Sequence, residues 1–282
     1  MRRVISYVWW PALFGASTAA TYWGVANGMT VVVFNATYLT LAFAIAVLER
    51  VMPHEKAWLA NDGQIFPDIA HTVLNKAVAQ ALVVSITFLG IAELASPGGG
   101  AWWPSSLPVV LQVALGLGHL EFGLYWKHRL AQEWQPLWGI LAVHHSVTRL
   151  WFLNTGRFHL VDTLSGLAFG IPVLLVLGAP QDVMIMVSAI TAIVGILTHS
   201  NVEMRCGWLN FVFNTPELHR WHHSKVLAEG NRNYGENLML FDLLFATYFN
   251  AARRPPADIG IRHPMPATFL GQLAVPFTRA PL

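Results

Sequence analysis

The sequence predicts an all-α integral membrane protein in which a helical cap carries a cluster of histidines. Of its 282 residues, 55% are hydrophobic and only 11% are charged, and the mean hydropathy is +0.48. An average soluble domain carries about 25% charged residues, so this chain is too apolar for a water-soluble domain. Long apolar runs and a histidine motif near residue 220 complete the prediction. We expect about four transmembrane helices plus a shorter hydrophobic hairpin, with the cap on the cytoplasmic side.

Six apolar runs are the expected membrane-embedded segments. They cover residues 4–26, 29–48, 77–95, 107–126, 163–179 and 183–198. The first four have about the 20 residues that a helix needs to cross the bilayer core. The last two are shorter and are interrupted by Pro172 or Gly195. We therefore interpret this last pair as the shallow hairpin.

Lysine and arginine residues orient the chain. With the N-terminus in the cytoplasm, all 17 of them fall on one side, whereas the opposite loops near residues 27–28, 96–106 and 180–182 carry none. Because cytoplasmic loops are rich in these residues, both termini are expected in the cytoplasm of a multi-pass protein, in a bacterial inner membrane. The net charge of +2 then reflects orienting charges and indicates no nucleic-acid partner. The glycine-rich stretch Pro97–Gly100, on the opposite side, is predicted as a turn.

The stretch NTPELHRWHHS, residues 214–224, predicts a metal site. It places His219, His222 and His223 at positions i, i+3 and i+4, which share one face of a helix. Thr215 suits the N-cap of that helix and Pro216 its first position. Neutral imidazole is a common ligand for zinc, iron and copper. A polar helix that is rich in histidine by accident is the alternative, and the ligand spacing disfavours it.

Histidines from other stretches reach the same cytoplasmic boundary. On the predicted topology these are His128, His144, His145 and His199. With the motif they offer seven imidazoles, which indicates either two metals or one metal with further hydrogen-bonding histidines around it. His159 is a further candidate, as a ligand or as a substrate contact. Four histidines are interpreted as ordinary: His54, His71, His119 and His263. The single cysteine, Cys206, excludes a cysteine-based metal cluster.

Two carboxylates are candidates for orienting the imidazoles. Glu121 lies within an expected span, where ionisable residues are costly and usually functional. A carboxylate beside a metal site commonly accepts the second N–H of a ligating histidine. The alternative for Glu121 is snorkelling or pairing with a basic residue, and the sequence leaves both open. Asp242 has the same two interpretations.

The motif segments together resemble the fatty acid hydroxylase and sterol desaturase superfamily. They are EFGLYWKHR (121–129), LWGILAVHHS (137–146), NTGRFHLVD (154–162), THSN (198–201), NTPELHRWHHSK (214–225) and NYGENLMLFDLLFATY (233–248), in order from about residue 45 to 250. The resemblance implies an integral membrane enzyme with a histidine-held, non-haem di-iron centre. It also implies that the seven histidines occupy ligand-motif positions. The expected domains are N-terminal membrane helices at 1–48, the hydroxylase-like domain at 49–250 and a proline-rich tail at 251–282.

Two positions depart from the family pattern. The family expects a histidine four residues after His128, where this chain has Gln132, and another three residues before His144, where it has Leu141. A glutamine carbonyl is a weak iron ligand, and a leucine cannot bind a metal. Fewer metal ligands are therefore expected on the side built from residues 128–145 than on the side built from residues 219–223.

The predicted function is that of a lipid oxidoreductase. The resemblance implies a monooxygenase that hydroxylates or desaturates a sterol, a fatty acyl chain or a related lipid, with O₂ and two iron ions, zinc being the alternative metal in purified protein. The chain shows no flavin or nicotinamide motif, so a separate ferredoxin, or a b-type cytochrome with its reductase, is expected to supply electrons at the basic cytoplasmic face. Two alternatives remain: a degenerate member of the family that binds lipid or a single metal, and a membrane haem protein with two histidine ligands.

Overall fold

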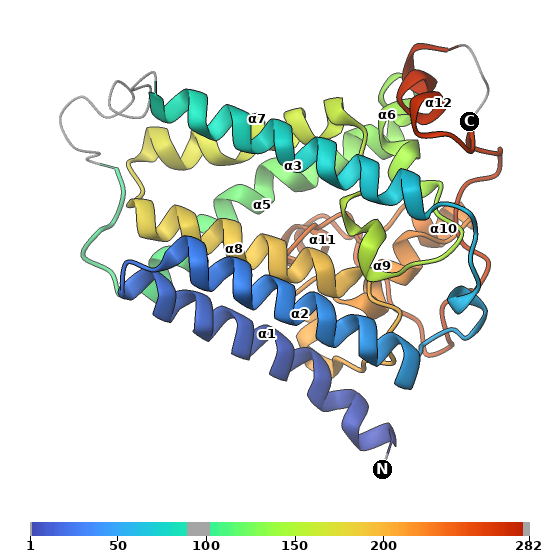
Figure 1. The fold of residues 1–282 in the computed structure, drawn as a ribbon, viewed down its shortest axis with the longest axis horizontal. Helices are drawn as coiled ribbons and strands as arrows, with labels where there is room; N and C mark the ends of the chain where they lie inside the picture. The colour runs from blue at the N-terminus through green and yellow to red at the C-terminus, as the bar shows by residue number, and fades with distance from the viewer. Residues whose placement is uncertain (1, 89–101, 279–282) are drawn as a thin grey trace.

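The computed structural model describes residues 2–88 and 102–278 and is all-helical (Figure 1). Six long helices form its body: α1 (Arg2–Ala26), α2 (Thr30–Val51), α3 (Ile65–Phe88), α5 (Val109–Glu133), α7 (Leu160–Leu177) and α8 (Gln181–Thr198). Five short helices follow or interrupt them: α6 (Gln135–His145), α9 (Pro216–His222), α10 (Leu227–Gly230), α11 (Leu240–Leu244) and α12 (Phe269–Ala274). The 3₁₀ turns are η1 (Ala57–Leu59), η2 (Phe152–Gly156), η3 (Gly207–Phe211) and η4 (Val275–Phe277).

The long helices lie side by side, and the short helices α6, α9, α10 and α12 gather at the end where α1 begins (Figure 1). Helix α1 packs against α2 and α8, and α5 packs against α7 and α8. One apolar core joins α1, α2 and α8 through Trp10, Ile45 and Leu197. A second joins α5 to α8 through residues such as Leu117 and Val187. Helix α8 therefore packs in both apolar cores, and it ends at the cap.

Four of the described helices are long and apolar enough to cross a membrane: α2, α5, α7 and α8. The prediction of an all-α membrane protein with about four spans is confirmed. Helices α7 and α8, the predicted hairpin, have 18 residues each, fewer than the other long helices, and they also meet the length and composition of a span. Helix α1 has 25 residues and is not among these four helices.

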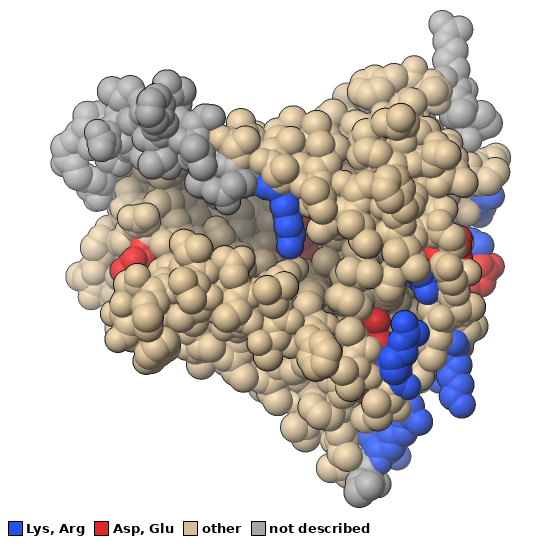
Figure 2. Space-filling view, in the orientation of Figure 1, with Lys and Arg blue, Asp and Glu red and all other residues tan. Residues whose placement is uncertain are grey.

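The surface of the body is apolar where lipid would touch it. On α2 the side chains of Val31, Val32 and Phe43 are 74%, 73% and 72% exposed. Such a contiguous exposed apolar face is unusual on a soluble monomer. Figure 2 shows that Lys and Arg side chains gather mainly at the cap end of this face. This asymmetry along the helices agrees with the distribution of basic residues in the sequence.

Helix α3 begins twelve residues before the apolar run that predicted it. Its first turns contain Asp68, His71 and Asn75, which break the hydrophobic pattern and yet are buried. Each of these side chains is hydrogen-bonded to a residue outside α3: Asp68 to Arg157, His71 to Gln272, and Asn75 to the carbonyls of Gly156 and Phe158. Polar residues so satisfied extend the helix into the cap. The end of the run 77–95 and the predicted turn at Pro97–Gly100 lie outside the described residues.

Candidate metal centre

Short helix α9 forms where the sequence predicted it. The Thr215 side chain caps its first turn by accepting the backbone N–H of Leu218, and Pro216 is the first helical residue. Between the histidines, the buried Arg220 donates to the carbonyls of Ser200 and Val202, immediately after α8. This guanidinium fixes α9 against the end of α8. As a result the histidines of α9 face His199, the residue that ends α8.

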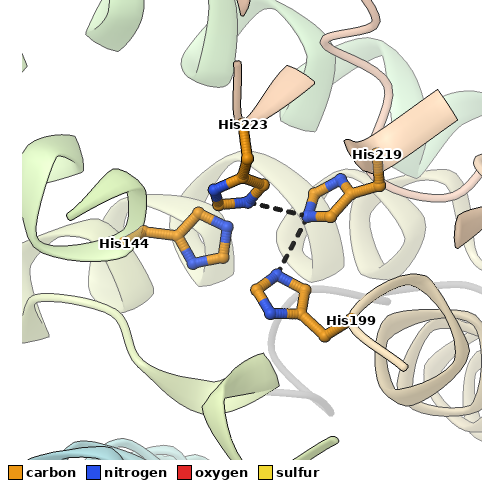
Figure 3. Close-up of side chains that lie close together, drawn as sticks. All are labelled: His144, His199, His219 and His223. Carbon is orange, nitrogen blue, oxygen red and sulfur yellow. Dashed lines mark hydrogen bonds between the residues drawn. The ribbon is translucent and has the colours of Figure 1, made fainter. Parts of the chain in front are cut away.

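The seven predicted histidines converge as two adjoining groups. His144, His199, His219 and His223 form the first, which we call the four-histidine group, and His128, His145 and His222 form the second, the three-histidine group. In each group one ring nitrogen per residue lies within 4.8 Å of the others, and every member is buried. Figure 3 shows the four rings of the first group directed at a common space.

Several ring nitrogens lie at hydrogen-bond distance from one another. In the four-histidine group, Nε2 of His219 lies 2.9 Å from Nε2 of His199 and 3.1 Å from Nε2 of His223 (Figure 3). In the three-histidine group, Nε2 of His222 lies 3.0 Å from Nε2 of His128. The two groups touch, because the ring centroids of His145 and His223 are 4.7 Å apart.

Two His-His pairs explain why the groups adjoin. The pair His144–His145 ends α6, and it contributes His144 to the four-histidine group and His145 to the three-histidine group. The pair His222–His223 ends α9 and is divided in the same way. Neighbouring side chains at a helix end point in different directions, so each pair bridges two centres that lie side by side.

The hydrogen bonds on the far side of the rings test whether a metal ion fits. Nδ1 of His128 lies 3.0 Å from the carbonyl of Tyr234, and Nδ1 of His222 lies 2.7 Å from that of Arg232. A carbonyl oxygen only accepts, so each Nδ1 carries the proton and each Nε2 of a neutral ring presents a lone pair. Two lone pairs facing each other at 3.0 Å repel unless a cation lies between them. The residues therefore fit a metal ion.

Two rings of the four-histidine group follow the same rule. Nδ1 of His199 lies 2.9 Å from Oδ1 of Asn154, and Nδ1 of His144 lies 3.3 Å from the carbonyl of Arg157. Among the described residues, the buried Nε2 of His145 and Nδ1 of His223 have no hydrogen-bond partner. Orphaned buried nitrogens are rare in native proteins and call for a missing partner. A set of neutral imidazoles suits iron, zinc or copper.

Burial also keeps the imidazoles in their metal-binding form. It lowers the pKa of His222 to about 4 and that of His199 to about 3. The pKa values of His144, His145 and His219 are lowered for the same reason, with the neighbouring histidines adding to the shift. These rings are therefore neutral at pH 7, and neutral imidazole is the species that coordinates metals.

The predicted accessory residues lie elsewhere or act differently. His159 joins neither group: its Nδ1 accepts the N–H of Val161 at the start of α7, and its Nε2 lies 3.1 Å from the carbonyl of Leu273. The carboxylate of Glu121 accepts the backbone N–H groups of Glu236 and Asn237, not an imidazole N–H. The four histidines interpreted as ordinary, His54, His71, His119 and His263, also lie outside both groups.

Asp242 positions a histidine indirectly. Its buried carboxylate accepts the N–H of Tyr234 and that of Gly235, and also the hydroxyl of Thr247. Tyr234 in turn supplies the carbonyl that orients His128. Gly235 leaves no room for a side chain here, because an added Cβ would lie 2.3 Å from the carbonyl oxygen of Leu238. The NYG segment is therefore a backbone support for the three-histidine group.

Replacing Asp242 with alanine is expected to weaken this support. Two buried backbone N–H groups lose their acceptor, at about 1–3 kcal/mol each, and His128 loses the fixed carbonyl beside it. We expect lower thermal stability and metal affinity for the three-histidine group reduced about 10-fold. Metal titration of the purified protein measures the change. Asp258→Ala, at a carboxylate 82% exposed, is the matched control, and equal affinities in the two variants would contradict the positioning role.

Three residues of the site were missed by sequence reasoning. Asn154 orients His199, Arg157 supplies the carbonyl for His144, and Arg220 fixes α9. All three side chains are polar and at most 2% exposed. The available signal was their position, since Asn154 and Arg157 lie in the quoted segment NTGRFHLVD and Arg220 lies between the motif histidines.

The fold and the site together define a helical membrane protein with two adjoining histidine groups of the kind that bind metal ions. Comparison with known proteins agrees with this class. The family description "Fatty acid hydroxylase" matches residues 113–247. Ornithine lipid hydroxylase OlsE of Rhizobium tropici is 48% identical over 280 residues, which are 98% of this chain and 85% of that protein. The chain belongs to the fatty acid hydroxylase family, and it is a membrane-bound lipid hydroxylase.

More distant relatives share only part of their length with this chain. Alkylglycerol monooxygenase of Danio rerio is 28% identical over 174 residues, covering 61% of this chain and 35% of that protein. The human alkylglycerol monooxygenase is 27% identical over 146 residues, covering 52% and 32%. The chain thus spans about a third of the length of these relatives. No solved structure gives a significant match.

Proposed function

We propose that this protein hydroxylates an ornithine-containing membrane lipid, with two iron ions held by the two histidine groups. The observation that carries the proposal is the convergence of seven histidines, from four separated stretches of chain, into two adjoining groups of facing nitrogens. The similarity to an ornithine lipid hydroxylase over 98% of the chain supports the choice of substrate. The relatives that we compared are hydroxylases or monooxygenases, which favours hydroxylation over desaturation.

The chain's own residues would hold, orient and shield the reacting centre. Iron bound by imidazoles supplies the activation of O₂ that breaks an unactivated C–H bond. The carbonyls of Tyr234 and Arg232 keep Nδ1 of His128 and His222 protonated, and so direct Nε2 at the centre. Apolar side chains such as Leu141, which lies beside His144 in the wall of a cavity, exclude water from it. Exclusion of water protects a reactive oxidant from side reactions.

A cavity of about 260 Å³ reaches this centre. Its wall contains His128, His144, His199 and His219, together with Glu236 and with residues of α2, α3 and α8. A larger groove of about 1020 Å³ runs along α5 and α7, and none of the seven histidines is among its described lining residues. The smaller cavity is therefore the substrate site that we propose.

The electron donor is proposed to dock at the basic end of the molecule, on the cytoplasmic side. Arg2, Arg3, Lys56, Arg205 and Arg254 line one depression there, of about 500 Å³. Lys and Arg gather at this end of the face in Figure 2, as the positive-inside rule requires of a cytoplasmic end. A cationic surface attracts an acidic partner such as a ferredoxin, and such attraction weakens with salt.

Lipid mass spectrometry tests the reaction. The chain is expressed in a bacterium that makes ornithine lipids and lacks this protein, and total lipids are compared with those from cells that express His222→Ala. We expect ornithine lipids to gain the mass of one oxygen atom only with the unaltered chain. Loss of two hydrogens instead would replace hydroxylation by desaturation, and unchanged ornithine lipids would overturn the proposed substrate.

Gln132 provides a prediction about the three-histidine group. Its Nε2 donates to the carbonyl of Gly230 and to Oδ1 of Asn231, while its buried Oε1 has no hydrogen-bond partner among the described residues. We propose that this oxygen is a weak fourth ligand. Gln132→His is expected to raise metal affinity and Gln132→Leu to lower it, each by about 10-fold, as measured by metal titration.

The other departure from the family pattern gives the control. Leu141 is 1% exposed and lines the cavity without any donor atom, so Leu141→Ile, which conserves volume and adds no donor atom, is expected to leave metal affinity unchanged. If Gln132→His and Gln132→Leu bind metal alike, Gln132 is no ligand. A single metal per chain with no lipid turnover in the unaltered protein would instead favour the alternative function, a degenerate member of the family that binds lipid or one metal.

A further inference from the structure

We propose that Lys76 is the specificity-determining residue of the cavity and binds the carboxylate of the substrate headgroup. This inference rests on the proposed function, because it takes an ornithine-containing lipid as the substrate. It assigns a role to a side chain that belongs to neither histidine group.

Lys76 shares one cavity with the metal centre. The cavity of about 260 Å³ is lined by Tyr38 of α2 and by Thr72 and Lys76 of α3, and also by His144 and His199. Side chains from α2 and α3 therefore border the same space as the clustered imidazoles. Figure 2 shows the face of the molecule hollowed between these helices, with a basic side chain in the hollow. A lipid that reaches the histidines through this space passes Lys76.

Lys76 is an exposed residue in the wall of the cavity. It lies eleven residues after the start of α3, which is about 16 Å along the helix. The residues that follow it in α3 are mainly apolar. A cation beside apolar side chains is available to an anionic ligand that enters the cavity.

No acidic partner of Lys76 is found within the described part of the chain. Its Nζ lies 4.7 Å from the centroid of the Tyr38 ring and forms no ion pair within 4.0 Å. The contrast is Lys127, which is paired with Asp162 at 2.9 Å and with Glu236 at 3.2 Å. The ring of Tyr38 holds the ammonium without neutralising it, so Lys76 keeps its capacity to bind an anion.

The charge of Lys76 matches the carboxylate of the headgroup. An ornithine that is acylated on one nitrogen retains one carboxylate and one ammonium. The cavity offers Lys76 as a cation, whereas Glu236 in the same wall is already paired with Lys127. A carboxylate on Lys76 forms a charge-assisted hydrogen bond, which is roughly twice as strong as a neutral one. A neutral lipid of the same chain length lacks this contact.

The test compares two substrates in wild type and two variants. Wild type, Lys76→Met and Lys76→Arg are reconstituted with iron in phosphatidylcholine nanodiscs and supplied with O₂ and a chemical reductant, and turnover is measured on an ornithine lipid and on its carboxyl methyl ester. We expect Lys76→Met to lower kcat/KM for the free acid by about 10- to 100-fold, with little change for the ester. Lys76→Arg keeps the cation and is expected to recover most of the activity. Arg262→Met, at an exposed cation that lines neither this cavity nor the proposed docking depression, is the control.

The outcomes separate the inference from the proposed function. Equal losses on acid and ester would mean that Lys76 has a structural role or pairs with a lipid phosphate, and this overturns the inference. Unchanged activity of Lys76→Met on both substrates overturns it as well. Metal content and melting temperature, measured in the same samples, show whether a variant is folded. If wild type oxidises neither substrate, the proposed function itself is wrong, and that result is distinct from both.

Discussion

Replacing His222 with alanine is expected to abolish lipid hydroxylation and to remove the metal of the three-histidine group. Nε2 of His222 lies 3.0 Å from Nε2 of His128, and without it that group retains only His128 and His145. Loss of a residue that orients a ligand lowers metal affinity by about 10- to 100-fold. Loss of a ligand itself is expected to lower the affinity further. Mass-spectrometric metal analysis of the purified protein and lipid turnover measure the two effects.

The four-histidine group makes this prediction specific. It contains no contribution from His222, so its metal is expected to remain, and the metal content should fall by about half rather than to zero. His263→Ala alters an exposed histidine outside both groups and is the matched control. A metal content that does not change in His222→Ala would contradict the ligand role. A loss of both metals would mean that the two groups bind cooperatively.

The sequence predicted which histidines meet, and not how they divide. The spacing of His219, His222 and His223 follows from one helix, so it could be predicted from a local pattern. The division of each His-His pair between two groups depends on how α5, α6, α8 and α9 pack. That arrangement is set by long-range contacts such as those of Arg220 with the chain after α8. Spacing along one helix contains no information about such contacts.

The carboxylates show a second limit of sequence reasoning. Glu121 and Asp242 were expected either to accept an imidazole N–H or to snorkel or pair with a basic residue, and both are buried. Their partners are backbone N–H groups of residues 234–237 and not imidazoles. A sequence shows side chains and hides the direction of backbone N–H and carbonyl groups. The backbone carbonyls of Tyr234, Arg232 and Arg157, which orient three of the imidazoles, could therefore not be predicted from the sequence.

The start of α3 was missed for a related reason. Hydropathy treats Asp68, His71 and Asn75 as signs of a loop, whereas the cap supplies each of them with a partner. The amphipathic first turns of α3 thus join the membrane body to the cap. The ion pair of Asp68 with Arg157 is the strongest of these links, since both side chains are at most 2% exposed.

Replacing Arg157 with methionine is expected to destabilise the cap and to weaken the four-histidine group. The guanidinium lies 2.8 Å from Asp68 and also donates to the carbonyl of Val143 and to the hydroxyl of Ser146, at the end of α6. Removing one partner of a buried ion pair costs about 3–5 kcal/mol, because the other charge is left uncompensated. Thermal unfolding in detergent measures the loss of stability.

The metal site should report the same change. The carbonyl of Arg157 orients Nδ1 of His144, and the ring of Phe158 stacks on His144 with centroids 4.2 Å apart. Once the guanidinium is lost, the segment is free to shift, and affinity of the four-histidine group is expected to fall by about 10- to 100-fold. Arg205→Met, which removes an exposed side chain 3.8 Å from Glu203, is the control and should cost at most about 1 kcal/mol.

A double variant separates the lost charge pair from the lost support of His144. Replacing Asp68 with leucine in the Arg157→Met background removes the uncompensated carboxylate, and apolar replacement of a whole buried pair is often neutral. Stability is therefore expected to recover in the double variant, whereas metal affinity stays low, because the bonds from Arg157 to Val143 and Ser146 are still absent. If metal affinity recovers together with stability, the ion pair acts only on folding, and the positioning role of Arg157 toward His144 is wrong.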